Sequence, residues 1–162
     1  MASVAWPGRS AARGFSIIEL VVVVAIMGVL AAIAVPRFAG ASASRRLDTA
    51  VLRLAADLRH AQQHGLATSA EVQVVFDAST ETYTVSAPSP VTGASSYSVC
   101  LSDAPTRVYI ESVTFGSNRA LFDGHGIPVA GGAVTLRAGR FSRVVSVVSG
   151  TPLVDLSTMA AN

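Results

Sequence analysis

Residues 15–35 read FSIIELVVVVAIMGVLAAIAV and are apolar throughout apart from Ser16 and one carboxylate, Glu19. At about 1.5 Å of rise per residue, a helix of this length reaches roughly 30 Å, the thickness of the hydrocarbon layer of a bilayer. The leader before it, residues 1–14, carries Arg9 and Arg13, and positive charge of this kind stays on the cytoplasmic side. The stretch therefore predicts a single membrane-spanning helix with a cytoplasmic N-terminus.

The composition limits what can follow this helix. A chain of 162 residues has room for an anchor and one small globular domain. All twelve basic residues are arginines, two of them in the leader, so the remaining ten balance the ten acidic residues. A nearly neutral mature protein has no overall attraction for nucleic acid. The only cysteine, Cys100, excludes an intramolecular disulfide and a cysteine-based zinc site, and we expect it to be a small buried side chain.

Beyond the apolar stretch the spacing of apolar residues changes twice, first to a helical pattern and then to an alternating one. Pro36 should kink or interrupt the helix, and from Gly40 to Gly65 an amphipathic helix is predicted, with Gly65 near its end. Its buried face comprises Leu47, Val51, Leu54, Leu58 and Ala61. Alternating segments then predict strands. They are 71–77, 81–86, 97–101, 107–115, 120–122, 133–136, 143–148 and 153–156. The predicted fold class is α+β, a long N-terminal helix packed on an antiparallel β-sheet head.

Three interpretations of residues 15–35 compete. A cleaved secretory signal is suggested by Ala32-Ile33-Ala34, but a carboxylate weakens an apolar signal region. A plain anchor would hold Glu19 at a cost of about 2–3 kcal/mol near the bilayer centre. Cleavage after Gly14 would instead give Phe15 a free α-amino group, which could neutralise Glu19 of a neighbouring subunit. Only the third interpretation gives the acid a partner.

The residues around Gly14 resemble a known processing site. Arg13-Gly14 followed by Phe15-Ser16-Ile17-Ile18-Glu19-Leu20 is similar to the start of type IV pilins and type II secretion pseudopilins, and Gly28 and Pro36 also match their helices. The resemblance implies that a prepilin peptidase cuts between Gly14 and Phe15 and methylates the amine of Phe15. It implies that Glu19, the fifth residue of the mature chain, acts in assembly.

A weaker resemblance extends to the end of the chain. Residues 55–62, 122–128, 131–136 and 143–150 are similar to the GspH/FimT group of minor pilins, in which a long helix carries a β-rich head. The division that follows is a leader at 1–14, a transmembrane and assembly helix at 15–36, its amphipathic continuation at 37–66, and a periplasmic head at 67–162.

The resemblance implies a structural subunit. Such a subunit would be held in the bacterial inner membrane, with its head in the periplasm, and would then join other pilins in a helical fibre. The fibre would be the type II secretion pseudopilus, which serves protein export. The alternative is a FimT-like minor pilin of a type IV pilus, with a part in pilus assembly or DNA uptake.

No combination of residues indicates catalysis, a cofactor or a metal. His60 and His64 are four positions apart, as in a two-histidine metal face, but no third ligand is near in sequence. Asp123 and His125 lie in a glycine-rich segment, where such residues commonly form turns. We therefore predict that the protein is not an enzyme.

One basic cluster could bind DNA. Arg137, Arg140 and Arg143 surround a predicted turn, and clustered arginines can contact phosphates. The DNA-binding pilins that this chain resembles carry a Gly-Arg-x-Arg motif near the C-terminus, whereas the corresponding residues 150–153 read GTPL. Nucleic acid is therefore a minor hypothesis, and a solvated turn is the main one.

Overall fold

The computed structural model describes residues 15–150 and 154–157, without the side chains of residues 34–37, 39 and 154–157. The chain divides into two compact units, Met1–Phe38 and Ala39–Asn162. One helix, α1 (Ile17–Thr68), begins in the first unit and ends in the second. Of the predicted kink or interruption at Pro36, the interruption is wrong, because α1 runs through this position. A proline removes only one helical hydrogen-bond donor, and the helix can continue on both sides of it.

The second unit contains the amphipathic part of α1, and its predicted buried face is confirmed. Leu47, Leu54, Leu58 and Ala61 are completely buried, and Val51 nearly so. The helix passes the predicted end at Gly65 and stops at Thr68. Gly65 instead lies at a close approach of the helix to a later turn, since a Cβ at this position would be 3.1 Å from the carbonyl oxygen of Asp123. A close approach of two backbones is a common reason for glycine.

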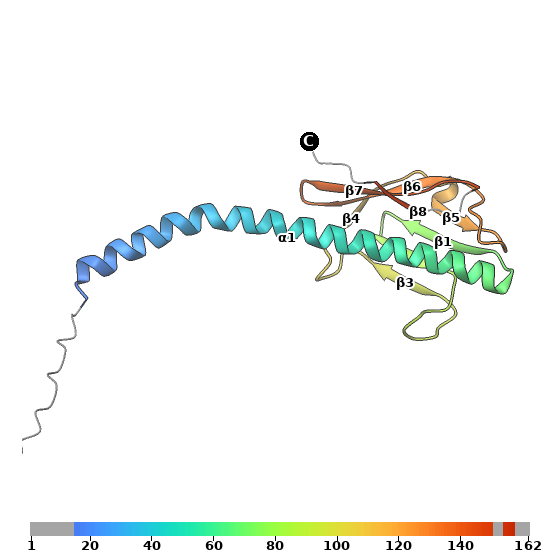
Figure 1. Ribbon diagram of the computed structural model, residues 1–162, viewed down its shortest axis with the longest axis horizontal. Coiled ribbons are helices and arrows are strands. Elements are labelled where there is room, and N and C mark those ends of the chain that lie inside the picture. The colour runs from blue at the N-terminus through green and yellow to red at the C-terminus, as the bar shows by residue number, and fades with distance from the viewer. Residues whose placement is uncertain (1–14, 151–153, 158–162) are drawn as a thin grey trace, which may run out of the picture. The chain divides into compact units, whose positions relative to one another are not determined.

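The predicted strands are present and are divided between two four-stranded sheets (Figure 1). The strands are β1 (Val72–Asp77), β2 (Thr82–Val85), β3 (Tyr97–Cys100), β4 (Tyr109–Val113), β5 (Arg119–Phe122), β6 (Gly132–Ala138), β7 (Phe141–Val147) and β8 (Val154–Ser157). A short 3-10 helix, η1 (Gly116–Asn118), precedes β5. The sheet orders are β3-β2-β1-β5 and β4-β6-β7-β8, and every pairing is antiparallel. The α+β fold class is confirmed.

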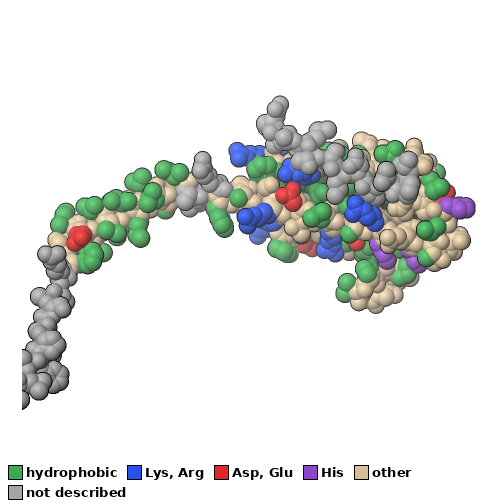
Figure 2. All heavy atoms as spheres, viewed as in Figure 1, with side chains coloured by type: hydrophobic (Ala, Val, Ile, Leu, Met, Phe, Trp, Pro, Cys, Tyr) green, Lys and Arg blue, Asp and Glu red, His purple; other side chains and the backbone are tan. Residues whose placement is uncertain are grey.

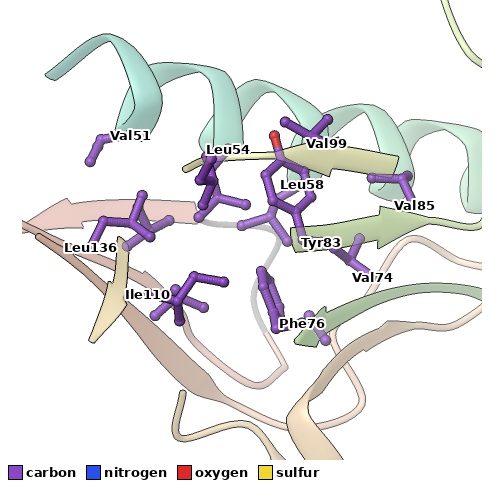
Figure 3. Packing of buried hydrophobic residues seen from close by; sticks show 14 of the residues in the cluster. Val51, Leu54, Leu58, Val74, Phe76, Tyr83, Val85, Val99, Ile110 and Leu136 are labelled. Atoms are coloured by element: carbon purple, nitrogen blue, oxygen red, sulfur yellow. The ribbon is translucent and has the colours of Figure 1, made fainter. Parts of the chain in front are cut away.

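The core lies between α1 and the strands (Figure 3). Leu54 and Leu58 of the helix meet side chains of both sheets, among them Tyr83 and Leu136. The rings of Phe76 and Phe115 are stacked, with centroids 5.7 Å apart. Burial of aromatic and branched side chains on this scale is the main force that holds the helix to the sheets. Tyr109 of β4 lies outside this core, because 47% of it is exposed.

A polar contact fixes the helix to the first sheet. The carboxylate of Asp57 accepts hydrogen bonds from the hydroxyls of Tyr83, at 2.6 Å, and Tyr97, at 2.9 Å. Arg53 lies one helical turn before Asp57, with its Nε 3.9 Å from the same carboxylate. Burial, followed by the hydrogen bond to Asp57, raises the pKa of Tyr83. The hydroxyl therefore remains a proton donor over the whole physiological pH range.

Candidate functional site

The first candidate site is the apolar part of α1. Its large apolar side chains from Ile17 to Ile33 are exposed to between 41% and 82%. Four consecutive valines, residues 21–24, cover all sides of the helix, because successive side chains are about 100° apart. Figure 2 shows apolar side chains along the visible face of this part of the helix. A helix that is apolar on every side is stable only when lipid or other protein covers it.

Glu19 is the only charged residue of this segment among residues 15–33. It lies in the first turn of α1, two residues after the first helical residue. An acid at this end of a helix is stabilised by the unpaired backbone N–H groups. Phe15 lies four positions before Glu19 and is 78% exposed. The predicted cleavage partner Gly14 lies outside the described residues.

Across the described part of the chain, no helix is found with a stretch that is both long enough and apolar enough to cross a membrane.

The second candidate site, the arginine cluster of the head, is not assembled as the sequence suggested. Arg137 is paired with Ser142 across β6 and β7, whereas Arg143 is paired with the buried Leu136. Residues directly opposite each other share a face of the sheet, and successive residues alternate. Arg137 and Arg143 therefore lie on opposite faces of their sheet.

Each of the three arginines has different surroundings. Nε of Arg143 is 3.2 Å from the Asp48 carboxylate on α1, and its side chain is only 18% exposed. The guanidinium of Arg140 lies over the ring of Phe141, 5.1 Å from the centroid. A Cβ built on Gly40 would lie 4.0 Å from Nη2 of Arg140. The turn therefore brings Arg140 to the helix, a contact that no local sequence pattern indicates.

Comparison with known proteins supports the interpretation of the N-terminal segment. Residues 9–35 match the model of the prokaryotic N-terminal methylation motif. The structure is similar to the crystal structure of the type IV minor pilin FimU from Pseudomonas aeruginosa strain PAO1, with a TM-score of 0.52 and 14% sequence identity. The similarity covers 70% of this chain and 90% of that one. The fold of the chain is like that of this type IV minor pilin.

At 14% identity the likeness to FimU establishes a shared fold, and the motif covers the N-terminal segment alone. The comparison with curated proteins finds no match. The pilin-like assignment therefore rests on the motif and the fold together.

The histidines of the pilin-like head do not form a metal centre in the described residues. Nε2 of His60 is 2.8 Å from the carbonyl oxygen of Pro88, and the His60 and His64 rings are 6.5 Å apart. Among the side chains described, no group of three or more His, Cys, Asp or Glu is placed to hold a metal ion. Cys100 is half-buried, with Sγ 3.3 Å from Oγ of Ser102.

Asp123 and His125 form a turn, as predicted. Oδ1 of Asp123 accepts hydrogen bonds from the backbone N–H groups of His125, at 2.9 Å, and Ile127, at 2.8 Å. The hydrogen bond from Ile127 lowers the pKa of Asp123. The carboxylate is thus occupied by its own turn, which packs against the end of α1 at Gly65.

Proposed function

We propose that this chain is a minor pilin or pseudopilin subunit. A prepilin peptidase cuts it between Gly14 and Phe15 and methylates the new amine, and the apolar segment holds it in the inner membrane until it enters a fibre. The observation that carries the proposal is a methylation motif at residues 9–35 that continues into a helix exposing apolar side chains on every side. Both lipid and neighbouring helices would cover those side chains.

In the fibre, Glu19 neutralises the N-terminal amine of a neighbouring subunit and sets the axial position of the helix. The proposal is supported by the place of Glu19 in the first turn, near the end that cleavage would create. An unpaired carboxylate in an apolar environment costs several kcal/mol, so pairing favours one arrangement over its alternatives.

The fibre that we propose first is the type II secretion pseudopilus, in which the subunit serves protein export. The alternative is a FimT-like minor pilin of a type IV pilus, and the similarity to the minor pilin FimU supports it. DNA uptake through Arg137, Arg140 and Arg143 gains no support from a turn that places two of them on opposite faces. Loss of secretion, as opposed to loss of pili, in a strain lacking the chain distinguishes the two systems.

N-terminal sequencing tests the processing step. The chain is coexpressed with a prepilin peptidase, and we expect a mature N-terminus at Phe15 that carries a methylated amine. A Gly14→Val variant should remain uncut, while Gly28→Val, where a Cβ meets nothing within 4 Å, is the matched control and should be cut normally. A mature chain that begins after Ala34 would show an ordinary signal peptide and contradict the proposal.

A further inference from the structure

Three arginines near the start of the head have no carboxylate partner in the part of the chain that the structure describes. They are Arg45 and Arg46 on α1 and Arg140 in the β6–β7 turn. The two acidic groups of this part of α1 are already engaged, since Asp48 pairs with Arg143 and Asp57 with Arg53. Figure 2 shows arginine side chains gathered over this end of the head. The local excess of positive charge is therefore not neutralised within the described head.

The geometry of α1 spreads these three cations around its axis. Arg140 approaches the side of the helix on which Gly40 lies, at 4.0 Å from a Cβ built there. At about 100° per residue, Arg45 projects roughly 140° from that side and Arg46 roughly 240° from it. The three directions are thus about 120° apart. We call Arg45, Arg46 and Arg140 the arginine ring.

The individual environments are compatible with an external anion. Arg45 and Arg140 are exposed, and the Arg140 guanidinium is held in place by the Phe141 ring. Nε of Arg46 is buried and has no hydrogen-bond partner among the described residues. A guanidinium binds phosphate through several N–H groups at once, so the remaining donors of each arginine can serve an outside ligand.

We propose that the arginine ring binds the anionic phospholipid headgroups of the membrane in which the subunit waits. This inference rests on the proposed function, because it needs the apolar segment to be in lipid. Gly40 follows Val35, the end of the apolar stretch, by five positions, or about 8 Å of helix, and Arg45 and Arg46 follow it by ten and eleven positions, or about 15–17 Å. Helical side chains lean toward the N-terminus of their helix, so the long side chains of Arg45 and Arg46 can reach back toward the headgroup layer.

The ring shape favours a membrane over nucleic acid. A helix that leaves a bilayer is surrounded by headgroups on all sides, so cations spread around it can each meet a phosphate. A DNA duplex approaches from one side and would contact only part of the ring, because its charge lies along a single rod. Contact with headgroups would hold the head at the membrane surface before assembly and would be lost when the helix is extracted.

Chemical modification of arginines tests the inference on the full, processed chain. The chain is inserted into nanodiscs of phosphatidylcholine, with or without phosphatidylglycerol, and treated with phenylglyoxal, and each arginine is followed by mass spectrometry. Attraction to an anionic surface stabilises each bound arginine by about 1 kcal/mol, which corresponds to about a fivefold change in an equilibrium constant. We therefore expect phosphatidylglycerol to slow the modification of Arg45 and Arg140 about fivefold. Arg59 and Arg119, which are exposed and lie outside the ring, should react equally in both discs.

Variants complete the test. An Arg45→Gln/Arg140→Gln chain should insert into phosphatidylcholine discs as well as its parent but retain fewer phosphatidylglycerol molecules, whereas Arg59→Gln/Arg119→Gln should retain them. Equal reactivity of the ring in both discs would overturn the inference, as would equal protection by inorganic phosphate or stronger protection by duplex DNA. Failure of the chain to enter any disc would instead contradict the proposed function.

Discussion

The carboxylate of Asp57 is the residue through which α1 is hydrogen-bonded to two strands of the first sheet. It accepts hydrogen bonds from the hydroxyls of Tyr83, which is completely buried, and Tyr97. Asp57→Ala would leave the Tyr83 hydroxyl in the core without this acceptor. Because an unsatisfied buried donor costs about 1–3 kcal/mol, we expect the free energy of unfolding to fall by about 2–3 kcal/mol. Urea denaturation of the full chain in a non-ionic detergent, followed by far-UV circular dichroism, measures it.

Two further variants separate this contact from general effects. Tyr83→Phe keeps the ring and removes only the hydroxyl, so it should cost about 1 kcal/mol. Glu71→Ala removes an exposed carboxylate just before β1 and should stay within about 0.5 kcal/mol of the parent. If Asp57→Ala lowered the free energy of unfolding no more than Glu71→Ala does, the Asp57 carboxylate would contribute nothing to stability.

The raised pKa of Tyr83 predicts how stability changes in alkali. In the unfolded chain this hydroxyl ionises near its ordinary pKa of 10.0, while in the folded protein it stays protonated above that value. The folded state then binds more protons, so the free energy of unfolding is unaffected below pH 10 and falls above it. Above pH 10, Tyr83 alone should lower the free energy of unfolding by about 1.4 kcal/mol per pH unit. Urea midpoints at several pH values should show a shallower fall in Tyr83→Phe, and identical slopes would contradict the assignment.

At the scale of elements, the sequence predicted the strands but not their division into two sheets. Alternation of side chains is local, and it located each strand within a few residues. The choice of sheet depends on distant contacts, such as the carboxylate of Glu81 that accepts a hydrogen bond from the backbone N–H of Ile110 in β4. The sequence also showed that Arg137, Arg140 and Arg143 are close together along the chain, which is local information. Only the register of β6 and β7 shows that Arg137 and Arg143 lie on opposite faces of the sheet.

The end of α1 packs against the turn that contains Gly124. The sequence predicted this turn but not its contact with the helix. A Cβ on Gly124 would lie 2.7 Å from the carbonyl oxygen of Ser69, so alanine there would push the turn away from the helix end. We expect Gly124→Ala to lower the free energy of unfolding by about 1–3 kcal/mol. Gly116→Ala is the control, because a Cβ there meets nothing within 4 Å. Equal urea midpoints for the two variants would contradict the close contact.

At the scale of the whole molecule, the N-terminal methylation motif could be predicted from sequence because it is local to a short segment. The partners of the head could not be predicted from sequence, because they depend on surfaces that the fold assembles from distant segments. The arginine ring combines α1 with the β6–β7 turn in this way. The apolar part of α1 differs from both, because its large apolar side chains are exposed over its whole length from Ile17 to Ile33.

Replacement of Glu19 tests the proposed contact that would position the apolar helix in a fibre. Glu19→Val keeps the segment apolar and leaves Gly14 and Phe15 unchanged, so we expect normal cleavage. Without the carboxylate, the N-terminal amine of a neighbour would be buried unpaired, at a cost of about 3–5 kcal/mol. The fraction of chain in sheared fibres should therefore fall about tenfold or more, measured by immunoblot against the membrane fraction. Glu71→Val, a matched change at an exposed position of the head, should assemble normally. Normal incorporation of the Glu19→Val chain would show that another contact sets the axial position.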